Sequence, residues 1–132
     1  MNAFTYRLSG GRLMNRFEGA PICLVTMTGH RSGKRRTVCL MYTPYRDKVL
    51  LVASLGGAPQ HPVWYHNLKA NPEIDIQVGS EARKMVAQEA SAQERRDLWP
   101  IVVANYPSFD TYQKRTAGQI PLFVCSPRQT GS

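Results

Sequence analysis

Residues 21–45 read PICLVTMTGHRSGKRRTVCLMYTPY, and this stretch decides the class of fold. Its two ends, 21–28 and 36–45, are rich in β-branched and other apolar residues, which is typical of strands. The middle, 29–35, is basic and begins at Gly29, so it predicts a loop. We therefore predict two antiparallel strands joined by a basic loop.

The segments that follow extend this pair into a larger antiparallel sheet. A tight turn is expected over 46–48, and it leads into a third strand over 49–55. Residues 73–78 alternate between apolar and polar side chains, which predicts a half-buried strand, with 82–90 as its hairpin partner. A last strand is expected over 120–125. About six mostly antiparallel strands hide their edges most naturally in a closed or split β-barrel.

Two or three helices are predicted between these strands, so the fold class is α+β. The first covers 63–70 and ends at Asn71-Pro72. The second runs from 92 toward 104, starts at a capping box of Ser91 and Glu94, and should be kinked by Pro100. A short third helix is expected over 109–116.

The two ends of the chain are expected to lie outside this barrel. A short helix over 11–18 would make residues 1–19 a helical extension. Its basic residues could touch a membrane surface, although a solvated helix face is the simpler interpretation. Residues 127–132 are expected to form a frayed tail, so that 1–132 is one domain with a terminal extension at each end.

Composition is that of an ordinary globular domain. The chain has 132 residues, of which 42% are hydrophobic and 20% charged, and this length suits a single domain. We find no apolar run long enough for a membrane span and no secretory signal at the N-terminus. Three widely spaced cysteines do not indicate a disulfide framework, so a reduced, cytoplasmic protein is expected.

The net charge of +8 calls for an anionic partner. Four of the 17 Lys and Arg residues lie within 31–36, beside Gly33. A concentrated basic loop suits a phosphate or carboxylate cluster better than a long duplex. Because aromatic and basic residues are not interleaved on the expected exposed strands, nucleic acid is not an expected partner.

Three segments together resemble the deazaflavin-dependent nitroreductase and quinone reductase family. They are TMTGHRSGKRRT at 26–37, ASLGGAPQHPVWYHNLKANP at 53–72, and YPSFDTY at 106–112 followed by Ile120-Pro121. The resemblance implies a split β-barrel related to FMN-binding reductases. It also implies coenzyme F-420, a deazaflavin with a phosphodiester and an oligoglutamate tail. The reduced coenzyme would give a hydride to a small acceptor such as a quinone, a nitroaromatic or an enone.

The resemblance also implies roles for individual residues. Ser54 would lie against the deazaflavin ring, and Tyr106 and Tyr112 would line the acceptor pocket, where a hydroxyl can hydrogen-bond the acceptor or supply a proton. These three are the expected catalytic residues. The expected coenzyme contacts are His30, Arg31, Ser32, Arg36, Thr37, Val38, Cys39, Met41, Ala53, Ser54, Val63, Trp64, Tyr65, His66 and Asn67.

Several of these positions allow a second interpretation. The basic loop could be a solvated hairpin, Trp64 a core residue and the aromatic residues of 106–112 a plug over the barrel end. The chain departs from the family pattern at His30, Arg35, Cys39, Leu55 and Phe109. These departures leave open a cofactor-free binding or cyclising protein on the same barrel.

Two further questions concern other cofactors and assembly. FMN also has a phosphate and a flat ring, and it stays an alternative to F-420. No metal site is expected, because His61 and His66 do not share a helix face and no third ligand has suitable spacing. A homodimer is compatible with such a barrel.

Overall fold

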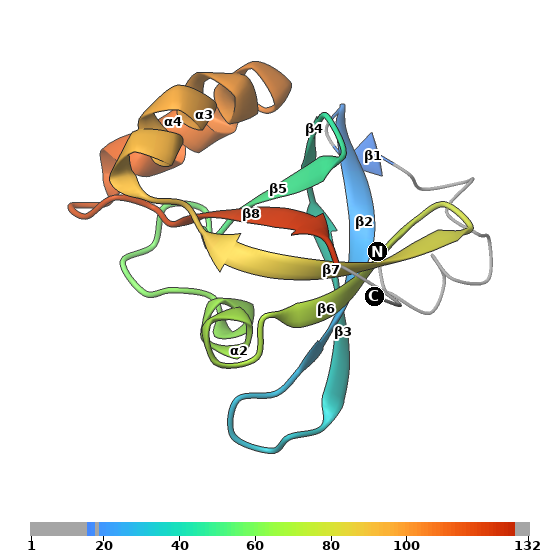
Figure 1. Ribbon diagram of the computed structural model, residues 1–132. Coiled ribbons are helices and arrows are strands. Elements are labelled where there is room, and N and C mark those ends of the chain that lie inside the picture. Colours follow the sequence, from blue (N-terminus) through green and yellow to red (C-terminus); the bar gives the residue numbers. More distant parts are fainter. Residues whose placement is uncertain (1–15, 18, 129–132) are drawn as a thin grey trace.

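The computed structural model describes residues 16–17 and 19–128, which form an antiparallel barrel with three helices (Figure 1). The strands are β1 (Arg16–Phe17), β2 (Ala20–Thr28), β3 (Arg35–Met41), β4 (Thr43–Tyr45), β5 (Lys48–Val52), β6 (Glu73–Val78), β7 (Glu81–Glu89) and β8 (Leu122–Pro127). The helices are α2 (Val63–Ala70), α3 (Ala92–Asn105) and α4 (Ser108–Arg115). The α+β class and the split-barrel architecture are confirmed.

The strands follow the order β1-β2-β6-β7-β8-β5-β4, and β3 pairs with β2 outside this path. Every pairing between the described strands is antiparallel. The β2–β3 ladder is long and regular, running from Ile22 opposite Met41 to Thr28 opposite Arg35. The loop between these two strands therefore projects from the end of the ladder and comes to lie beside α2 (Figure 1).

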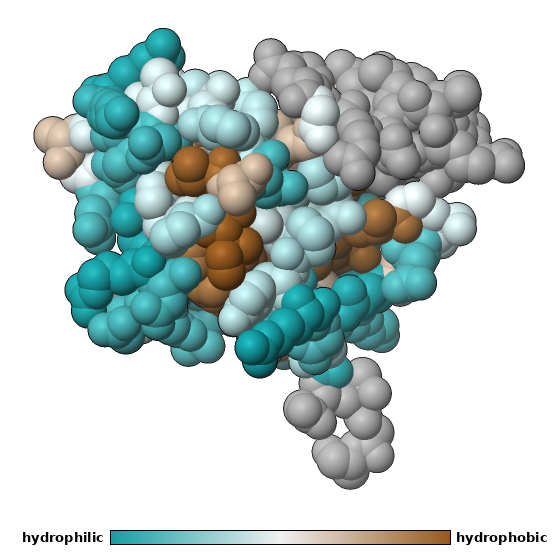
Figure 2. Space-filling view, turned by 90° about the horizontal axis from the view of Figure 1, so that it is seen from above, coloured by the Kyte–Doolittle hydropathy of each residue, from teal (hydrophilic) through white to brown (hydrophobic). Residues whose placement is uncertain are grey.

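In the described part of the chain, the alternation of strand residues gives two large hydrophobic cores and a small cluster at Ile22 and Leu24. The barrel interior contains Met27, Leu51 and Phe123, and α2 closes it by inserting Trp64 and Leu68. The second core lies between the outer face of the barrel and the α3–α4 pair, which packs over β4, β5 and β8 (Figure 1). Seen from above, where α3 and α4 are uppermost, the surface is mainly polar with small apolar patches (Figure 2).

The strand expected over 36–45 is two strands, because the chain changes partners at Tyr42. Up to Met41 the chain pairs with β2, whereas Thr43–Tyr45 pairs with β5. Tyr42 itself donates its N–H to Pro21 O over 3.0 Å, and its carbonyl accepts from Asn105 Nδ2 over 3.0 Å. The bend is fixed by a residue of α3 far along the chain, which no local pattern reveals.

The expectations for both ends of the chain were partly wrong. Residues 16–17 form β1 rather than helix, because Gly19 with φ +85° lets the chain turn back and pair with Ala20 and Pro21. The rest of the extension expected over 1–19 lies outside the described residues, except for Gly19 itself. At the other end, Pro127 belongs to β8 and the next N–H, that of Arg128, donates to Lys84 O over 2.9 Å. The tail therefore does not begin at 127.

Candidate functional site

The basic loop is a tightly folded hairpin end. Gly29 N–H donates to Lys34 O over 2.8 Å, and Gly33 N–H donates to Gly29 O over 3.0 Å. Gly33 has φ +70°, which favours glycine. A Cβ added at Gly29 would lie 2.8 Å from Ser32 Oγ and 3.1 Å from Arg36 Nε. The two glycines thus allow the loop to close on itself with its cationic side chains outward.

Helix α2 holds this loop in place. Asn67 is 3% exposed, and its Oδ1 accepts from His30 N over 2.8 Å and lies 2.6 Å from His30 Nδ1. One turn later, Asn71 Nδ2 donates to Thr28 O over 3.4 Å. The loop and the helix therefore form one unit, although they are far apart in the sequence.

Loop and helix enclose a groove of about 440 Å³. Its lining residues are Gly29, His30, Arg31, Ser32, Arg36, Val63, His66 and Asn67, and they include no carboxylate. In the described part of the chain, the ion pairs of this hairpin involve Arg35 rather than Arg31 or Arg36. Backbone turns with cationic side chains bind anions well, so the groove suits a phosphate or carboxylate ligand.

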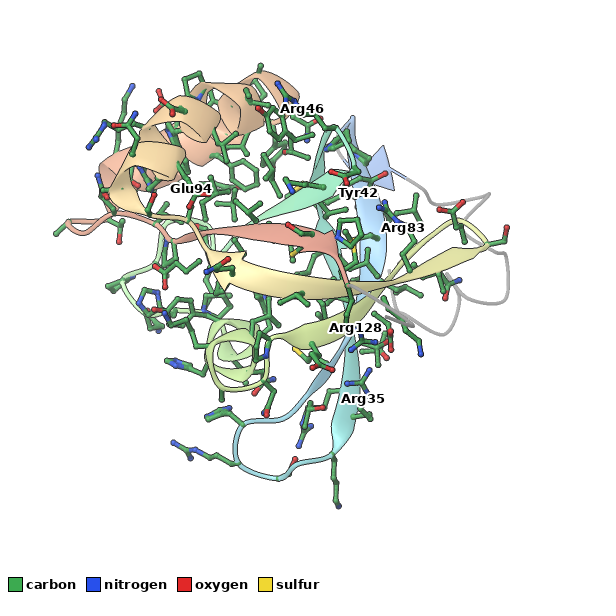
Figure 3. All side chains as sticks on the ribbon, in the orientation of Figure 1. Arg35, Tyr42, Arg46, Arg83, Glu94 and Arg128 are labelled. Carbon is green, nitrogen blue, oxygen red and sulfur yellow. The ribbon has the colours of Figure 1, made fainter. Side chains whose placement is uncertain are left out.

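Arg35, next to Arg36 in the chain, serves another surface. It donates to Asp75 Oδ2 over 2.7 Å and to Thr28 Oγ1 over 3.0 Å. Arg128 also contacts Asp75, over 3.8 Å, so the two guanidinium groups lie in one ion-pair network beside β6 (Figure 3). Of these two neighbouring cations, Arg35 supports the fold and Arg36 faces the groove.

The expected contacts on β3 fall on two faces of the strand. Val38 packs with the interior core on the side of Arg36. Cys39 and Met41 pack against Ile22 and Leu24 on the opposite face, where Thr37 Oγ1 lies 2.9 Å from Thr26 Oγ1. The structure therefore does not bring Thr37, Cys39 and Met41 together with Arg36 in the groove.

Helix α2 likewise divides the residues expected on it. Val63 and His66 are exposed and line the groove. Trp64 is 8% exposed and packs against Phe123, so it is a core residue. Tyr65 is half-buried, and the ring of His61 stacks on it with a centroid distance of 4.2 Å.

A second, smaller pocket of about 60 Å³ lies beyond His61. It is lined by Ala53 and Ser54, by 58–61, and by residues of the segment between α4 and β8 (Thr116, Gly118, Gln119, Ile120 and Pro121). Ser54 follows β5, and its Oγ accepts from Gly57 N over 3.0 Å, which is the role of a turn residue. The participation of the 116–121 segment was missed from the sequence, and the resemblance at Ile120-Pro121 is the signal that could have found it.

The two expected catalytic tyrosines lie side by side but differ in access. Their hydroxyl oxygens are 3.3 Å apart. Tyr106 is 5% exposed and packs with Phe109 at a ring distance of 5.0 Å, whereas Tyr112 is half-buried on α4. A ligand on this surface can therefore reach Tyr112, with Tyr106 behind it.

Cys23 and Cys125 are core residues, and Cys39 is partly buried. All three are free, and burial raises the pKa of Cys39, places that of Cys23 well above its usual range and raises that of Cys125 to about 12. Thiols of this kind stay protonated near neutral pH and are poor nucleophiles. Within the described ranges there is no group of three His, Cys, Asp or Glu side chains that could hold a metal ion, and no helix there is long and apolar enough to cross a membrane.

A comparison with protein families supports an assignment that the geometry alone leaves open. The model of the F420H(2)-dependent quinone reductase family matches residues 1–127. The chain belongs to this family. Membership in the F420H(2)-dependent quinone reductases means that coenzyme F-420 is the cofactor, so the FMN alternative is not needed.

Individual relatives agree with this family assignment. An F420H(2)-dependent quinone reductase of Mycobacterium tuberculosis (strain H37Rv) is 39% identical over 127 residues, which are 93% of this chain and 85% of the relative. A solved F420-H2 dependent reductase (FDR-A) is 42% identical with a TM-score of 0.75, covering 80% of this chain and 94% of that one. Another solved chain, described as a domain-swapped dimer, is 37% identical with a TM-score of 0.76. The match covers 93% of this chain and 94% of that one.

More distant structures share the fold alone. One is a structure described as a pyridoxamine 5'-phosphate oxidase from Listeria innocua, which is 8% identical with a TM-score of 0.58 and covers 82% of this chain and 84% of that one. This likeness supports the split-barrel architecture predicted from the strand pattern. It carries no information about the ligand of this chain.

Proposed function

We propose that this chain uses reduced coenzyme F-420 to reduce a quinone, with nitroaromatics and enones as further acceptors to be tested. The observation that carries the proposal is the groove between the basic loop and α2, where Arg31, Arg36 and His66 meet without a carboxylate. The phosphodiester and glutamate tail of the coenzyme is a polyanion of the kind that such a groove binds.

The residues of the groove would hold the coenzyme rather than react with it. Arg31 and Arg36 offer guanidinium donors, and Ser32 offers a hydroxyl on the same loop. When bound, the reduced deazaflavin supplies the hydride, and the protein supplies position and electrostatics. The tight hairpin matters here because donors that are fixed before binding cost little ordering on binding.

The acceptor end would be formed by the smaller pocket and α4. Ser54 lines this pocket, and the turn that follows it packs on α4, where a Cβ added at Gly57 would meet Tyr112 O at 2.8 Å. We place the ring near Ser54 and the acceptor near the hydroxyl of Tyr112. That hydroxyl can stabilise negative charge on the acceptor oxygen or give it a proton, and Tyr106 orients it from behind.

Binding of the coenzyme to matched arginine variants tests the groove. Arg36→Ala should weaken binding of oxidised F-420, followed by fluorescence, by about 1.5–3 kcal/mol, the usual range for a charged hydrogen bond. This corresponds to roughly 10- to 150-fold in Kd. Arg35→Ala removes the same charge from the neighbouring residue but faces Asp75, so its Kd should stay close to that of the wild type.

The outcome of this pair decides the proposal. Weakening in Arg36→Ala alone supports the groove, whereas equal weakening in both variants would show only a general effect of net charge. If the wild type binds no F-420, the reductase function is refuted and a cofactor-free role on the same barrel is the remaining hypothesis. Steady-state reduction of quinones and nitroaromatics by the loaded protein then defines the acceptor range.

A homodimer is part of the same proposal. The solved chain described as a domain-swapped dimer is 37% identical to this one, which supports this part of the proposal. Within the described sheet, β3 is joined to the other strands through β2 alone, so an exchange of β3 between two chains would replace one ladder by the same ladder to the partner. Light scattering after size-exclusion chromatography should give twice the chain mass, and a monomer at all concentrations would refute this part.

The cellular setting proposed is the cytoplasm. The three free cysteines suit a reducing compartment, since two of them are buried and none is paired. Fractionation of cells that produce the protein, followed by detection in the soluble and membrane fractions, tests this directly.

A further inference from the structure

His30 is held by Asn67 through two of its nitrogen atoms. The backbone nitrogen of His30 lies 2.8 Å from Asn67 Oδ1, and the ring Nδ1 lies 2.6 Å from the same oxygen. Asn67 is itself fixed, because it is 3% exposed and its Nδ2 donates to Met27 Sδ over 3.4 Å. The His30 ring therefore has one defined orientation against a buried, immobile group.

This geometry determines which ring nitrogen carries the proton in the neutral imidazole. A backbone N–H can only donate, so the Asn67 atom that faces it must be the carbonyl oxygen and not the amide nitrogen. The ring Nδ1 faces the same oxygen and must donate to it as well. In the neutral ring Nε2 then bears a lone pair and can only accept a hydrogen bond.

The position of His30 means that its tautomer affects how the groove binds an anion. The ring lines the cationic groove together with Arg31 and Arg36 of the hairpin and His66 of α2, whose ring centroid is 5.6 Å away. A phosphate or carboxylate oxygen is an acceptor and gains nothing from a lone pair on Nε2. Protonation turns Nε2 into a charged donor, the type of group that binds an anion strongly.

We propose that Asn67 is a positioning residue that makes anion binding in this groove proton-linked: the anionic part of the coenzyme binds together with one proton taken up at His30 Nε2. The proton comes from solvent, the ring changes from neutral to singly positive, and the new N–H donates to a phosphate or carboxylate oxygen. This inference rests on the proposed function, because it takes the coenzyme as the occupant of the groove.

The other groups that face His30 lack its fixed contact with Asn67. Arg31 and Arg36 keep their charge over the whole physiological range. His66 lines the same groove, but its ring is not among the partners of Asn67 in the described residues. His61 lies farther out, with its ring centroid 6.1 Å from that of His66, and it lines the smaller pocket.

Nitrogen NMR of the free protein tests the tautomer first. The chain has three histidines, so the side-chain signals can be assigned with His30→Gln, His61→Gln and His66→Gln. At about pH 8, where an ordinary imidazole is neutral, His30 should show a protonated Nδ1 and an unprotonated Nε2. Asn67→Leu removes the acceptor and should produce a mixture of tautomers, whereas Asn67→Asp keeps it. The opposite tautomer in the wild type would overturn the inference.

Calorimetry then tests the proton uptake. Titration of oxidised F-420 at about pH 7.5 into the protein, in two buffers with different ionisation enthalpies, should show uptake approaching one proton, and affinity should fall by up to tenfold per pH unit above this. Uptake should be lost in His30→Gln and kept in Arg35→Ala, the control, whose side chain pairs with Asp75 and does not line the groove. Tight binding without uptake, or uptake unchanged in His30→Gln, overturns the inference alone. Absence of binding at every pH overturns the proposed function and the inference together.

Discussion

Arg95 offers a sharp test of how the helices are attached to the barrel. Its Nε donates to Ile120 O over 2.9 Å and its Nη2 donates to Gln113 Oε1 over 2.6 Å. The guanidinium carbon lies 4.2 Å from the ring centroid of Trp99. Burial lowers the pKa of Arg95, which shows that the group is partly removed from water. One side chain thus joins α3, α4 and the segment that lines the smaller pocket.

Replacement of Arg95 by Met keeps an unbranched apolar stem and removes the guanidinium with both of its hydrogen bonds. Each hydrogen bond from a charged group contributes about 1.5–3 kcal/mol when buried, and partial exposure reduces this, so we expect a loss of about 3 kcal/mol in the free energy of unfolding. For a domain of this size that is a fall in Tm of roughly 10 °C. Calorimetry or chemical denaturation measures both quantities.

Arg96 provides the matched control for this change. It is exposed and donates to Gln93 Oε1 over 2.7 Å within its own helix. Arg96→Met should change the free energy of unfolding by less than about 0.5 kcal/mol, as surface substitutions usually do. If Arg95→Met and Arg96→Met have equal effects on stability, the attachment described above is refuted.

Three further predictions concern a glycine in a turn, a buried thiol and the pair of tyrosines. Gly57→Ala should cost more stability than Gly56→Ala, by about 1–2 kcal/mol, because both glycines have positive φ but only at Gly57 would a Cβ meet backbone, at 2.8 Å. Equal denaturation midpoints for the two variants would contradict this. The raised pKa of Cys125, about 12 against an ordinary 9.0, favours the neutral thiol in the folded state. The contribution of this shift to the free energy of unfolding is fully present below about pH 9 and is lost as the pH rises toward 12. Between about pH 8 and about pH 10.5, the free energy of unfolding of the wild type should therefore fall by about 2 kcal/mol more than that of Cys125→Ala. If the free energies of unfolding of the two proteins change in parallel with pH, this prediction is refuted. Tyr112→Phe should lower kcat for quinone reduction about 10- to 100-fold with little change in the Kd of F-420, and Tyr106→Phe should have a smaller effect. A larger effect at Tyr106 would reverse the assigned order of the two hydroxyl groups.

The strands and helices could be predicted from the sequence wherever the pattern is local. The alternation over 73–78 and the capping box of Ser91 and Glu94 gave elements that the structure confirms, with both capping hydrogen bonds present. The prediction failed where distant residues decide. The break at Tyr42 depends on Asn105, which is 63 residues away, and the β1 turn depends on pairing rather than on helical spacing.

The candidate site could be predicted as a set of segments but not as a geometry. The resemblance identified the basic loop and α2, and the structure brings them together around Asn67. The resemblance could not show that Trp64 is buried or that Tyr106 lies behind Tyr112. These properties depend on packing between elements, whereas motif matching assigns a role to each position separately.

The placement of Arg35 and Arg36 on opposite faces has a consequence for how this hairpin can change in evolution. Their roles are set by register, since Arg35 lies opposite Thr28 and Arg36 opposite Met27. A substitution in the loop alters one side chain, but a shift of one residue in the ladder would turn every β3 side chain to the other face. The groove cation would then lie beside Asp75, and the cation of the ion-pair network would enter the groove. We therefore expect the length of the loop to vary less than its composition: insertions or deletions there should be much rarer among functional relatives than exchanges of one loop residue for another.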